Sequence, residues 1–448
     1  MPRHRGDCGR REKSGWSRRA FLRACPPIVS LSSFAFAGKL NFSSGLVRSR
    51  WSIFQNREDG SDQNRMNNRP HIAVVGAGAF GGWTALYLLR RGAKVTLVDS
   101  WGPGNSRASS GGETRVIRGT YGANQPYTKM VVRAFTLWEE NERKWRRQLL
   151  HRIGVLWMVH GDEAFERASL PELRAAGIPF EELSVAELQK RWPQINFEGV
   201  RWGIYESSSG YLTARVACQS VVQGFMAEGG EYKMATVSPP AIAKGKVDRG
   251  KFDGLTLSDG SKLVADHYVF ACGPWMGKFF REIIGEKIRP TKQDVFFFGT
   301  PAGDTRFEET NFPVWADHRE QFLYGIPGNQ SRGFKVADDT RGPVFDPTSG
   351  ERVVSVEKLR AVREYLGFRF PALKDAPLIE TRVCQYEDTP DGNFIIDRHP
   401  GADNVWLIGG GSGHGFKHGP ALGEMVAGLV MDNKMPDPTF RLGRFAGK

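Results

Sequence analysis

The stretch HIAVVGAGAFGGWTALYLLRRGAKVTLVD, residues 71–99, decides the fold of this chain. A short β-branched run at 72–75 leads directly into Gly76, Gly78 and Gly81. The first glycine permits a tight turn, the second leaves room for a diphosphate, and the third lets the following helix pack closely on the strand. We therefore predict a strand–turn–helix unit that holds a dinucleotide at the helix N-terminus.

The far end of the same stretch supports this interpretation. The helix is expected from Ala79 to Arg91, Gly92 closes it, and a second strand at 95–98 ends at Asp99. An acid at that position is suited to bind a ribose hydroxyl. A glycine motif by itself is weak evidence, but here strand, glycines, helix, strand and acid are all in register. The unit alone does not distinguish NAD from FAD.

A similar pattern recurs near the end of the chain. A strand at 405–408 precedes the glycine-rich turn GGGSGHGFK at 409–417, and apolar residues at helical spacing follow from 421 to 429. Two such units far apart in sequence predict one cofactor domain built from separated segments, with a substrate domain inserted between them. That arrangement favours FAD.

The middle of the chain contains further periodic patterns. We expect a hairpin over 255–270 that turns at 259–260, and strands of a second sheet at 295–298, 322–326 and 334–337. In the last strand Lys335 alternates with Phe334 and Val336, so its side chain lies on the opposite face. From this pattern alone we expect Lys335 to be solvated.

Charge and cysteine content exclude several classes of protein. The net charge is +13, but residues 1–65 hold 13 Lys and Arg against 5 Asp and Glu, so most of the basicity lies in a leader and nucleic-acid binding is not expected. None of the five cysteines forms a CxxC pair. We expect neither a metal site nor a disulfide framework.

The leader resembles a twin-arginine export signal. Arg18 and Arg19 are followed by Phe21 and Leu22, and a modest apolar stretch ends in a small-x-small pattern that places cleavage after Ala37. We therefore expect residues 1–37 to be a signal peptide for export to the periplasm, and 38–69 a linker. The alternative is a basic extension or a mis-called start, which leaves the protein in the cytoplasm. No other apolar run is long enough for stable membrane insertion.

The chain resembles the amine-oxidizing flavoprotein family that includes D-amino-acid oxidase, in the branch of monomeric sarcosine oxidase, N-methyltryptophan oxidase and pipecolate oxidase. The likeness spans about residues 70–440. It rests on the glycine box, on Lys335 in its strand, and on Cys384. It also rests on three further segments: Gly112-Glu113-Thr114-Arg115-Val116-Ile117-Arg118, 391–400 and Ser412-Gly413-His414-Gly415-Phe416-Lys417.

The resemblance implies an α/β fold with two domains. The Rossmann-like FAD-binding domain, of the glutathione-reductase type, is expected from 70–120, 210–284 and 381–440. The substrate domain, α+β with a mixed or antiparallel sheet, is expected from 121–209 and 285–380. A monomer is expected.

The resemblance also implies roles for individual residues. Cys384 matches the cysteine that is joined covalently to the flavin, and Arg115 is expected close to the flavin. Arg118 and Lys417 match the pair that holds the substrate carboxylate, and Tyr324 a tyrosine of the substrate pocket. Lys335 matches the lysine that lies over the flavin and activates oxygen, which reverses the expectation of a solvated side chain. The expected cofactor-binding set is Gly76, Gly78, Gly81, Asp99, Arg115, Cys384, Gly411, Ser412, Gly413, His414, Gly415 and Lys417.

The chain departs from the family pattern at two places. Ser110 and Gly111 stand where sarcosine oxidase has two histidines, and Asp339 stands where a pocket histidine is expected. These differences leave the substrate open, and the acid at 339 suggests a more cationic substrate.

The resulting hypothesis is an FAD-dependent amino-acid oxidase. A neutral secondary amine with a carboxylate gives a hydride to flavin N5, the imine hydrolyses, and O₂ is reduced to hydrogen peroxide. Two alternatives are a dehydrogenase that passes electrons to a quinone or other carrier, and a flavin-binding subunit without turnover.

Overall fold

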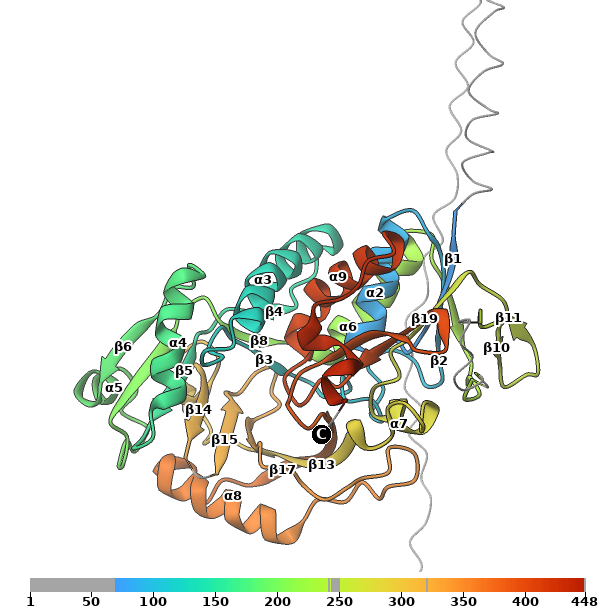
Figure 1. The fold of residues 1–448 in the computed structure, drawn as a ribbon. Coiled ribbons are helices and arrows are strands. Elements are labelled where there is room, and N and C mark those ends of the chain that lie inside the picture. Colours follow the sequence, from blue (N-terminus) through green and yellow to red (C-terminus); the bar gives the residue numbers. More distant parts are fainter. Residues whose placement is uncertain (1–68, 241, 243–249, 320, 447–448) are drawn as a thin grey trace, which may run out of the picture. The chain divides into compact units, whose positions relative to one another are not determined.

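The computed structural model describes residues 69–446, apart from 241, 243–249 and 320 (Figure 1). The expected signal peptide and nearly all of the expected linker lie outside the described residues.

A six-stranded sheet lies at the centre of the first half of the fold. Its strand order is β18-β19-β12-β1-β2-β9. All neighbouring pairs are parallel except β18 with β19. The strands are β1 (His71–Val75), β2 (Lys94–Asp99), β9 (Glu231–Met234), β12 (His267–Phe270), β18 (Ile395–His399) and β19 (Ala402–Gly409). All of these strands come from the three segments assigned above to the FAD-binding domain.

Both faces of this sheet are covered, as is usual for parallel strands. Ile72 and Val74 of β1 pack with the helices on one face, while Ala73 and Val75 pack with residues of the other face. The first face carries α2 (Ala79–Arg90), α6 (Ala214–Ala227) and α9 (Gly419–Met431), with α3 (Gln125–Trp145) packed on α9 (Figure 1). The second face carries β10 (Leu255–Thr256), β11 (Lys262–Leu263) and α7 (Met276–Phe279).

The turn between β1 and α2 leaves no room for side chains. Gly76 has φ +106°, and a Cβ there would lie 2.3 Å from the carbonyl oxygen of Ala271. A Cβ on Gly81 would lie 1.9 Å from the carbonyl oxygen of Gly76, so the helix packs directly on the turn. The predicted strand, helix and strand are therefore confirmed, with the helix ending one residue earlier than expected.

The hairpin expected over 255–270 is wrong beyond Leu263. β10 pairs with β11, but β12 is a separate strand that runs parallel to β1. Asp266 turns the chain between them, because its backbone N–H donates to the carbonyl of His71 at 2.8 Å and its carboxylate accepts from the His71 N–H at 2.7 Å.

A mixed eight-stranded sheet forms the second half of the fold. Its order is β17-β13-β16-β15-β14-β5-β7-β6, with β14 parallel to β5 and all other pairs antiparallel. The strands are β5 (Val155–Val159), β6 (Glu181–Ser184), β7 (Trp202–Glu206), β13 (Arg289–Phe298), β14 (Val314–His318), β15 (Phe322–Ile326), β16 (Phe334–Asp338) and β17 (Leu378–Asp388). β17 crosses the expected domain boundary at 381 and pairs with β13.

The two faces of the eight-stranded sheet differ. Phe334 and Val336 belong to the core under α8 (Val356–Arg369), whereas Lys335 lies on the opposite face. That face is also buried, and Lys335 is only 2% exposed. The solvated side chain expected from the alternation alone is therefore wrong, because the sheet is covered on both sides.

A buried ion pair helps to fix α8 on this sheet. Arg369 of α8 contacts Asp317 of β14 at 2.8 Å, and both side chains are fully buried. His160 at 2.6 Å and Tyr365 at 2.8 Å complete the hydrogen bonds of the carboxylate. Because its acceptors are satisfied, this ion pair orders the helix without leaving a bare charge.

A small antiparallel sheet carries the start of the substrate segment. It consists of β3 (Arg115–Ile117), β8 (Gly210–Leu212) and β4 (Leu150–His151). Among the described residues, the remaining α-helices are α4 (Ala164–Ala175) and α5 (Val185–Arg191). In the described part of the chain, no helix is both long and apolar enough to cross a membrane.

Candidate functional site

Three cavities meet at Arg115, the first residue of β3. Their volumes are about 390, 330 and 330 Å³, and Arg115 lines each of them. Its guanidinium donates to the carbonyls of Thr114 at 2.8 Å and Ser109 at 2.5 Å, and to the sulfur of Cys384 at 3.2 Å. We call the cavity of about 390 Å³ the first cavity. The second cavity is the one lined by Arg118 and Lys417, and the third is the one lined by Lys335 and Cys384.

The first cavity follows the glycine turn and fits a dinucleotide. Gly78 lines it, and a Cβ there would meet only the Ser110 hydroxyl at 3.4 Å, so the backbone can be approached. Gly78 is also the N-cap of α2 and supplies no side-chain cap, and the Ser110 hydroxyl accepts a hydrogen bond from the Ala79 N–H at 3.0 Å. The positive end of the helix, at Gly78 and Ala79, borders the cavity where a diphosphate is expected. Further along, Asp99 is held by the backbone N–H groups of Ala77, Trp101 and Gly102 at 2.8–2.9 Å. Burial raises the pKa of this carboxyl.

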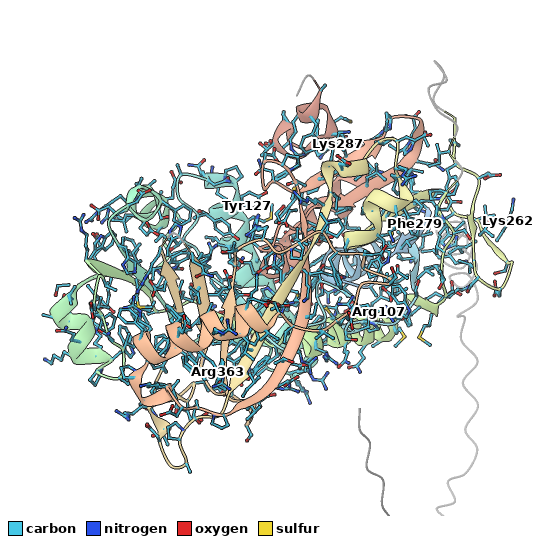
Figure 2. All side chains as sticks on the ribbon, turned by 90° about the horizontal axis from the view of Figure 1, so that it is seen from below. Arg107, Tyr127, Lys262, Phe279, Lys287 and Arg363 are labelled. Carbon is cyan, nitrogen blue, oxygen red and sulfur yellow. The ribbon has the colours of Figure 1, made fainter. Side chains whose placement is uncertain are left out.

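The remaining wall of the first cavity comes from the C-terminal glycine turn and from α7. Gly411, Gly413 and Gly415 line it on one side. Phe279 of α7 lines it as well and packs on Phe270 of β12, with ring centroids 6.4 Å apart (Figure 2). The carboxyl ends of β1, β2, β12 and β19 all lead into this cavity, as expected for a ligand site on a parallel sheet.

The second cavity holds two cations that both contact Tyr121. Lys417 donates to the hydroxyl of Tyr121 at 2.8 Å and to the carbonyl of His414 at 2.8 Å. The guanidinium of Arg118 lies 4.4 Å from the centre of the Tyr121 ring and 4.9 Å from that of Trp157. Burial, followed by the charge of Arg118, lowers the pKa of Lys417 well below its usual value. No carboxylate pairs with either cation among the described residues, so both can receive an anion.

The histidines beside this cavity are neutral. Burial lowers the pKa of His414 to about 3 and that of His418 well below its usual value. His414 contacts the carbonyl of Gly392 at 3.0 Å, and His418 contacts the Tyr121 hydroxyl at 2.7 Å. Tyr127 of α3, labelled in Figure 2, packs edge-on against His414 and at a tilt against His418, with ring centroids 4.8 and 5.6 Å apart. The imidazoles therefore support Tyr121 and the glycine turn.

Asp339 lines the same cavity but does not present a free charge. Its carboxylate pairs with Arg341 at 2.8 Å and accepts the Tyr386 hydroxyl at 2.7 Å. Tyr324 lies nearby, and burial raises the pKa of its phenol to about 12. Arg341, which Asp339 shares with Asp388, already engages this carboxylate, and burial raises its pKa. Asp339 is therefore not a free anion that gives reason to expect a cationic substrate.

The third cavity contains Lys335 and Cys384. The Lys335 ammonium donates to the carbonyl of Thr114 at 3.1 Å and lies 5.8 Å from the centre of the Tyr324 ring. Burial, followed by the charge of Arg115, lowers the pKa of Lys335 to about 7. Cys384 lies on β17 opposite Gln293 of β13, and its sulfur is a free thiol.

The residues predicted from sequence fall into four groups. Gly76, Gly78, Asp99, Arg115, Gly411, Gly413 and Gly415 line the first cavity. Arg118, Tyr324, Ser412, His414 and Lys417 line the second. Lys335 and Cys384 line the third. Gly81 lies under the turn, outside these linings.

Ser412 differs from the glycines around it. Its hydroxyl is buried and bonded to the backbone of Thr389 at 3.1 Å and Gly410 at 3.0 Å. This side chain therefore fixes the turn to the end of β17.

Sequence reasoning missed several lining residues. Tyr121, Trp157, Arg341 and Tyr386 line the second cavity, and Glu387 lines the first. The signal for Tyr386 and Glu387 was their position two and three residues after Cys384 in one strand. Trp157 carried no local signal, because only the fold brings it to Arg118, whereas the signal for Tyr121 was its position three residues after Arg118. No group of three His, Cys, Asp or Glu in the described part of the chain could hold a metal ion.

The chain matches the family model described as FAD dependent oxidoreductase over residues 71–429. It is 29% identical to monomeric sarcosine oxidase from Arthrobacter sp., over 81% of this chain and 92% of that protein. It is 30% identical to N-methyl-L-tryptophan oxidase from Escherichia coli, over 84% of this chain and 99% of that protein. Among solved structures, L-proline dehydrogenase from P. horikoshii shares the fold with a TM-score of 0.73 and 21% identity, over 84% of this chain and 98% of that one.

The buried lysine generates a prediction about stability and pH. The pKa of Lys335 is about 7 in the folded protein against an ordinary value of 10.5, so the unfolded chain binds the proton between these two values. Unfolding free energy contributed by this group therefore rises with pH across that window, by about 1.4 kcal/mol per pH unit. In urea unfolding of cofactor-free protein, Lys335→Met should be more stable than the wild type near pH 7. Its advantage should shrink by that slope toward pH 10, and parallel profiles would contradict the assignment.

Proposed function

Because the chain belongs to the family of FAD-dependent oxidoreductases, we propose that it oxidises the C–N bond of a secondary or N-substituted amino acid and passes the electrons to O₂. The observation that carries this proposal is the pair of cations, Arg118 and Lys417, in a cavity that joins the dinucleotide cavity at Arg115. The names of the relatives, sarcosine oxidase and N-methyl-L-tryptophan oxidase, support an N-methylated amino acid as substrate class.

The first cavity supplies the groups that would hold the cofactor. Gly76, Gly78 and the start of α2 would bind the diphosphate, and Asp99 a ribose hydroxyl. Bound FAD supplies the acceptor for the two electrons that leave the carbon next to the nitrogen. Arg115 would then lie beside the ring system, where the three cavities meet.

Arg118 and Lys417 orient the substrate. Two cations that are largely removed from water bind a carboxylate firmly and fix its direction. Lys417 gains most from this, since an anion offsets the desolvation that lowers its pKa. Holding the carboxylate in place holds the adjacent carbon at the junction of the cavities, which is the positional contribution to the rate.

The same charges keep the substrate amine neutral. Nearby cations disfavour a second positive charge, so they lower the pKa of a bound amine. The imidazoles of His414 and His418 are uncharged and do not alter this effect. A neutral amine has the lone pair needed for oxidation, so no separate general base is required.

Lys335 serves the second half of the reaction. Its amine lies in the third cavity, which Cys384 also lines and which Arg118 and Lys417 do not line. A fixed cation there would stabilise the negative charge that develops on oxygen as it is reduced. This supports oxygen over a quinone or another carrier as the electron acceptor.

A panel of amines tests the substrate class. Purified protein, mixed without air with N-methyl and cyclic amino acids and with their decarboxylated amines, should lose its flavin absorbance with the acids and only slowly with the amines. Lys417→Met should weaken this preference for the carboxylate by about tenfold or more, the value of a charge-assisted hydrogen bond. Lys335→Met is the matched control and should keep the preference. Absence of bleaching with every compound would favour the flavin-binding subunit.

Reoxidation in air tests the electron acceptor. Reduced Lys335→Met should react with O₂ about 10²-fold more slowly than the wild type, because the fixed charge is lost. Its peroxide yield per turnover should fall as well, while the rate of flavin reduction changes far less. Lys292→Met, on the neighbouring strand β13 and paired with Asp294, serves as the matched control. Slow reoxidation of the wild type itself, unaffected by Lys335→Met, would favour the dehydrogenase.

Acid precipitation tests covalent attachment through Cys384. The wild type should retain its flavin in the pellet, and Cys384→Ala should release it. Cys272→Ala is the matched control, since Cys272 lines the first cavity and burial raises the pKa of its thiol. Release of flavin from the wild type would refute the thioether.

A further inference from the structure

Glu387 is a buried acid, and only one of its two carboxylate oxygens has a hydrogen-bond partner among the described residues. It lies on β17, three residues after Cys384, lines the first cavity, and is 8% exposed. Its Oε1 accepts a hydrogen bond from the backbone N–H of Gly411 at 3.3 Å. Its Oε2 is buried and has no hydrogen-bond partner among the described residues. A buried carboxyl oxygen without a partner is costly, so a missing partner is expected in the cavity.

Two glycines leave the space that this carboxylate occupies. A Cβ on Gly273 would lie 3.0 Å from Oε2, and a Cβ on Gly411 would lie 2.9 Å from Oε1. Gly273 also has φ +52°, a conformation that other residues rarely adopt. The backbone therefore closes around the carboxylate, and no Lys or Arg of the described chain forms an ion pair with it.

The position of Glu387 selects one part of the cofactor. The diphosphate is expected at the start of α2, and the ring system beside Arg115 and Cys384. Three residues of extended strand place Glu387 about 10 Å along β17 from Cys384. Its neighbours Gly273 and Gly411 line the same cavity as Gly78 and Arg115, the residues expected at those two ends. The segment of FAD between diphosphate and ring is the ribityl chain, which carries hydroxyl groups.

We propose that Glu387 binds the ribityl hydroxyls of FAD through its free carboxylate oxygen. A hydroxyl donor satisfies this oxygen, whereas a diphosphate would be repelled by it. The inference rests on the FAD binding of the proposed function, and it does not depend on which amine is oxidised.

The electrostatics of the Glu387 carboxylate support this assignment. Burial raises the pKa of Glu387 to about 7, and the Gly411 N–H opposes the shift. A hydroxyl donating to Oε2 would act in the same direction as that N–H and stabilise the ionised form.

A double-mutant cycle with the cofactor tests the contact. Apoprotein of the full chain in a Cys384→Ala background, where binding is reversible, is titrated with FAD and with analogues that each lack one ribityl hydroxyl. The parent should bind at least one analogue about tenfold more weakly than FAD. Glu387→Leu should bind FAD about tenfold more weakly and no longer distinguish that analogue. Glu387→Gln, which keeps the shape, should show the same loss of discrimination in part.

A second readout separates cofactor binding from a structural role. Because the free oxygen is unsatisfied in the apoprotein, Glu387→Leu and Glu387→Gln should unfold at the same or a higher temperature than the parent without FAD, and at a lower one with it. Asp388→Asn is the matched control, since Asp388 is paired with Thr291 and Arg341 and should leave the discrimination intact.

Three results would overturn the proposal. The first is that Glu387→Leu and the parent lose the same affinity when FAD is replaced by the analogue. The second is that Glu387→Leu binds FAD more tightly than the parent. The third is that both Glu387 variants unfold at a lower temperature than the parent in the absence of FAD. Failure of the parent to bind FAD at all would overturn the proposed function together with this contact, which distinguishes the two cases.

Discussion

The backbone of the glycine turn lies directly against the backbone that follows β12. A Cβ on Gly76 would lie 2.3 Å from the carbonyl oxygen of Ala271, and one on Gly81 would lie 1.9 Å from the carbonyl oxygen of Gly76. This contact sets the distance between β1, α2 and β12, and the start of α2, whose Ala79 N–H donates to the Ser110 hydroxyl, borders the first cavity. Since β1, β2, β12 and β19 are parallel, the loops at their carboxyl ends gather at one edge and enclose the first cavity. The other two cavities are placed by their junction with it at Arg115.

The charges of the site follow one rule. Lys335 and Lys417 are buried, and both are held by neutral oxygens, from Thr114 in one case and from Tyr121 and His414 in the other. Their lowered pKa values express the cost of burying an ammonium without a counter-ion. Their charge is therefore available to small anions that enter the cavities. Glu387 is the converse case, an acid without a cation in a place where hydroxyl groups are expected.

The local patterns correctly predicted the elements around the two glycine turns and part of the second sheet. Period-two and helical spacing depend on residues close in sequence, so β1, α2, β2, β16, β19 and α9 could be identified in advance. The errors came where distant segments decide the outcome. The strand expected through Phe270 breaks at Asp266 because His71 binds it, and Lys335 is buried because its face of the sheet is covered. The carboxylate of Asp339 is paired with Arg341, which it shares with Asp388, and this pairing could not be read from the pattern.

The sequence by itself determined the glycine turn, the acid at the end of β2, and the chemical types of the residues at Arg118, Lys335, Cys384 and Lys417. Turn geometry and side-chain chemistry are local, so no fold is needed to recognise them. Only the tertiary structure decided that these residues divide among three cavities that share Arg115. It also decided that Tyr121 contacts both cations of the second cavity and that one oxygen of Glu387 lacks a partner among the described residues. Burial and hydrogen-bond partners depend on segments hundreds of residues apart, and packing alone brings those together.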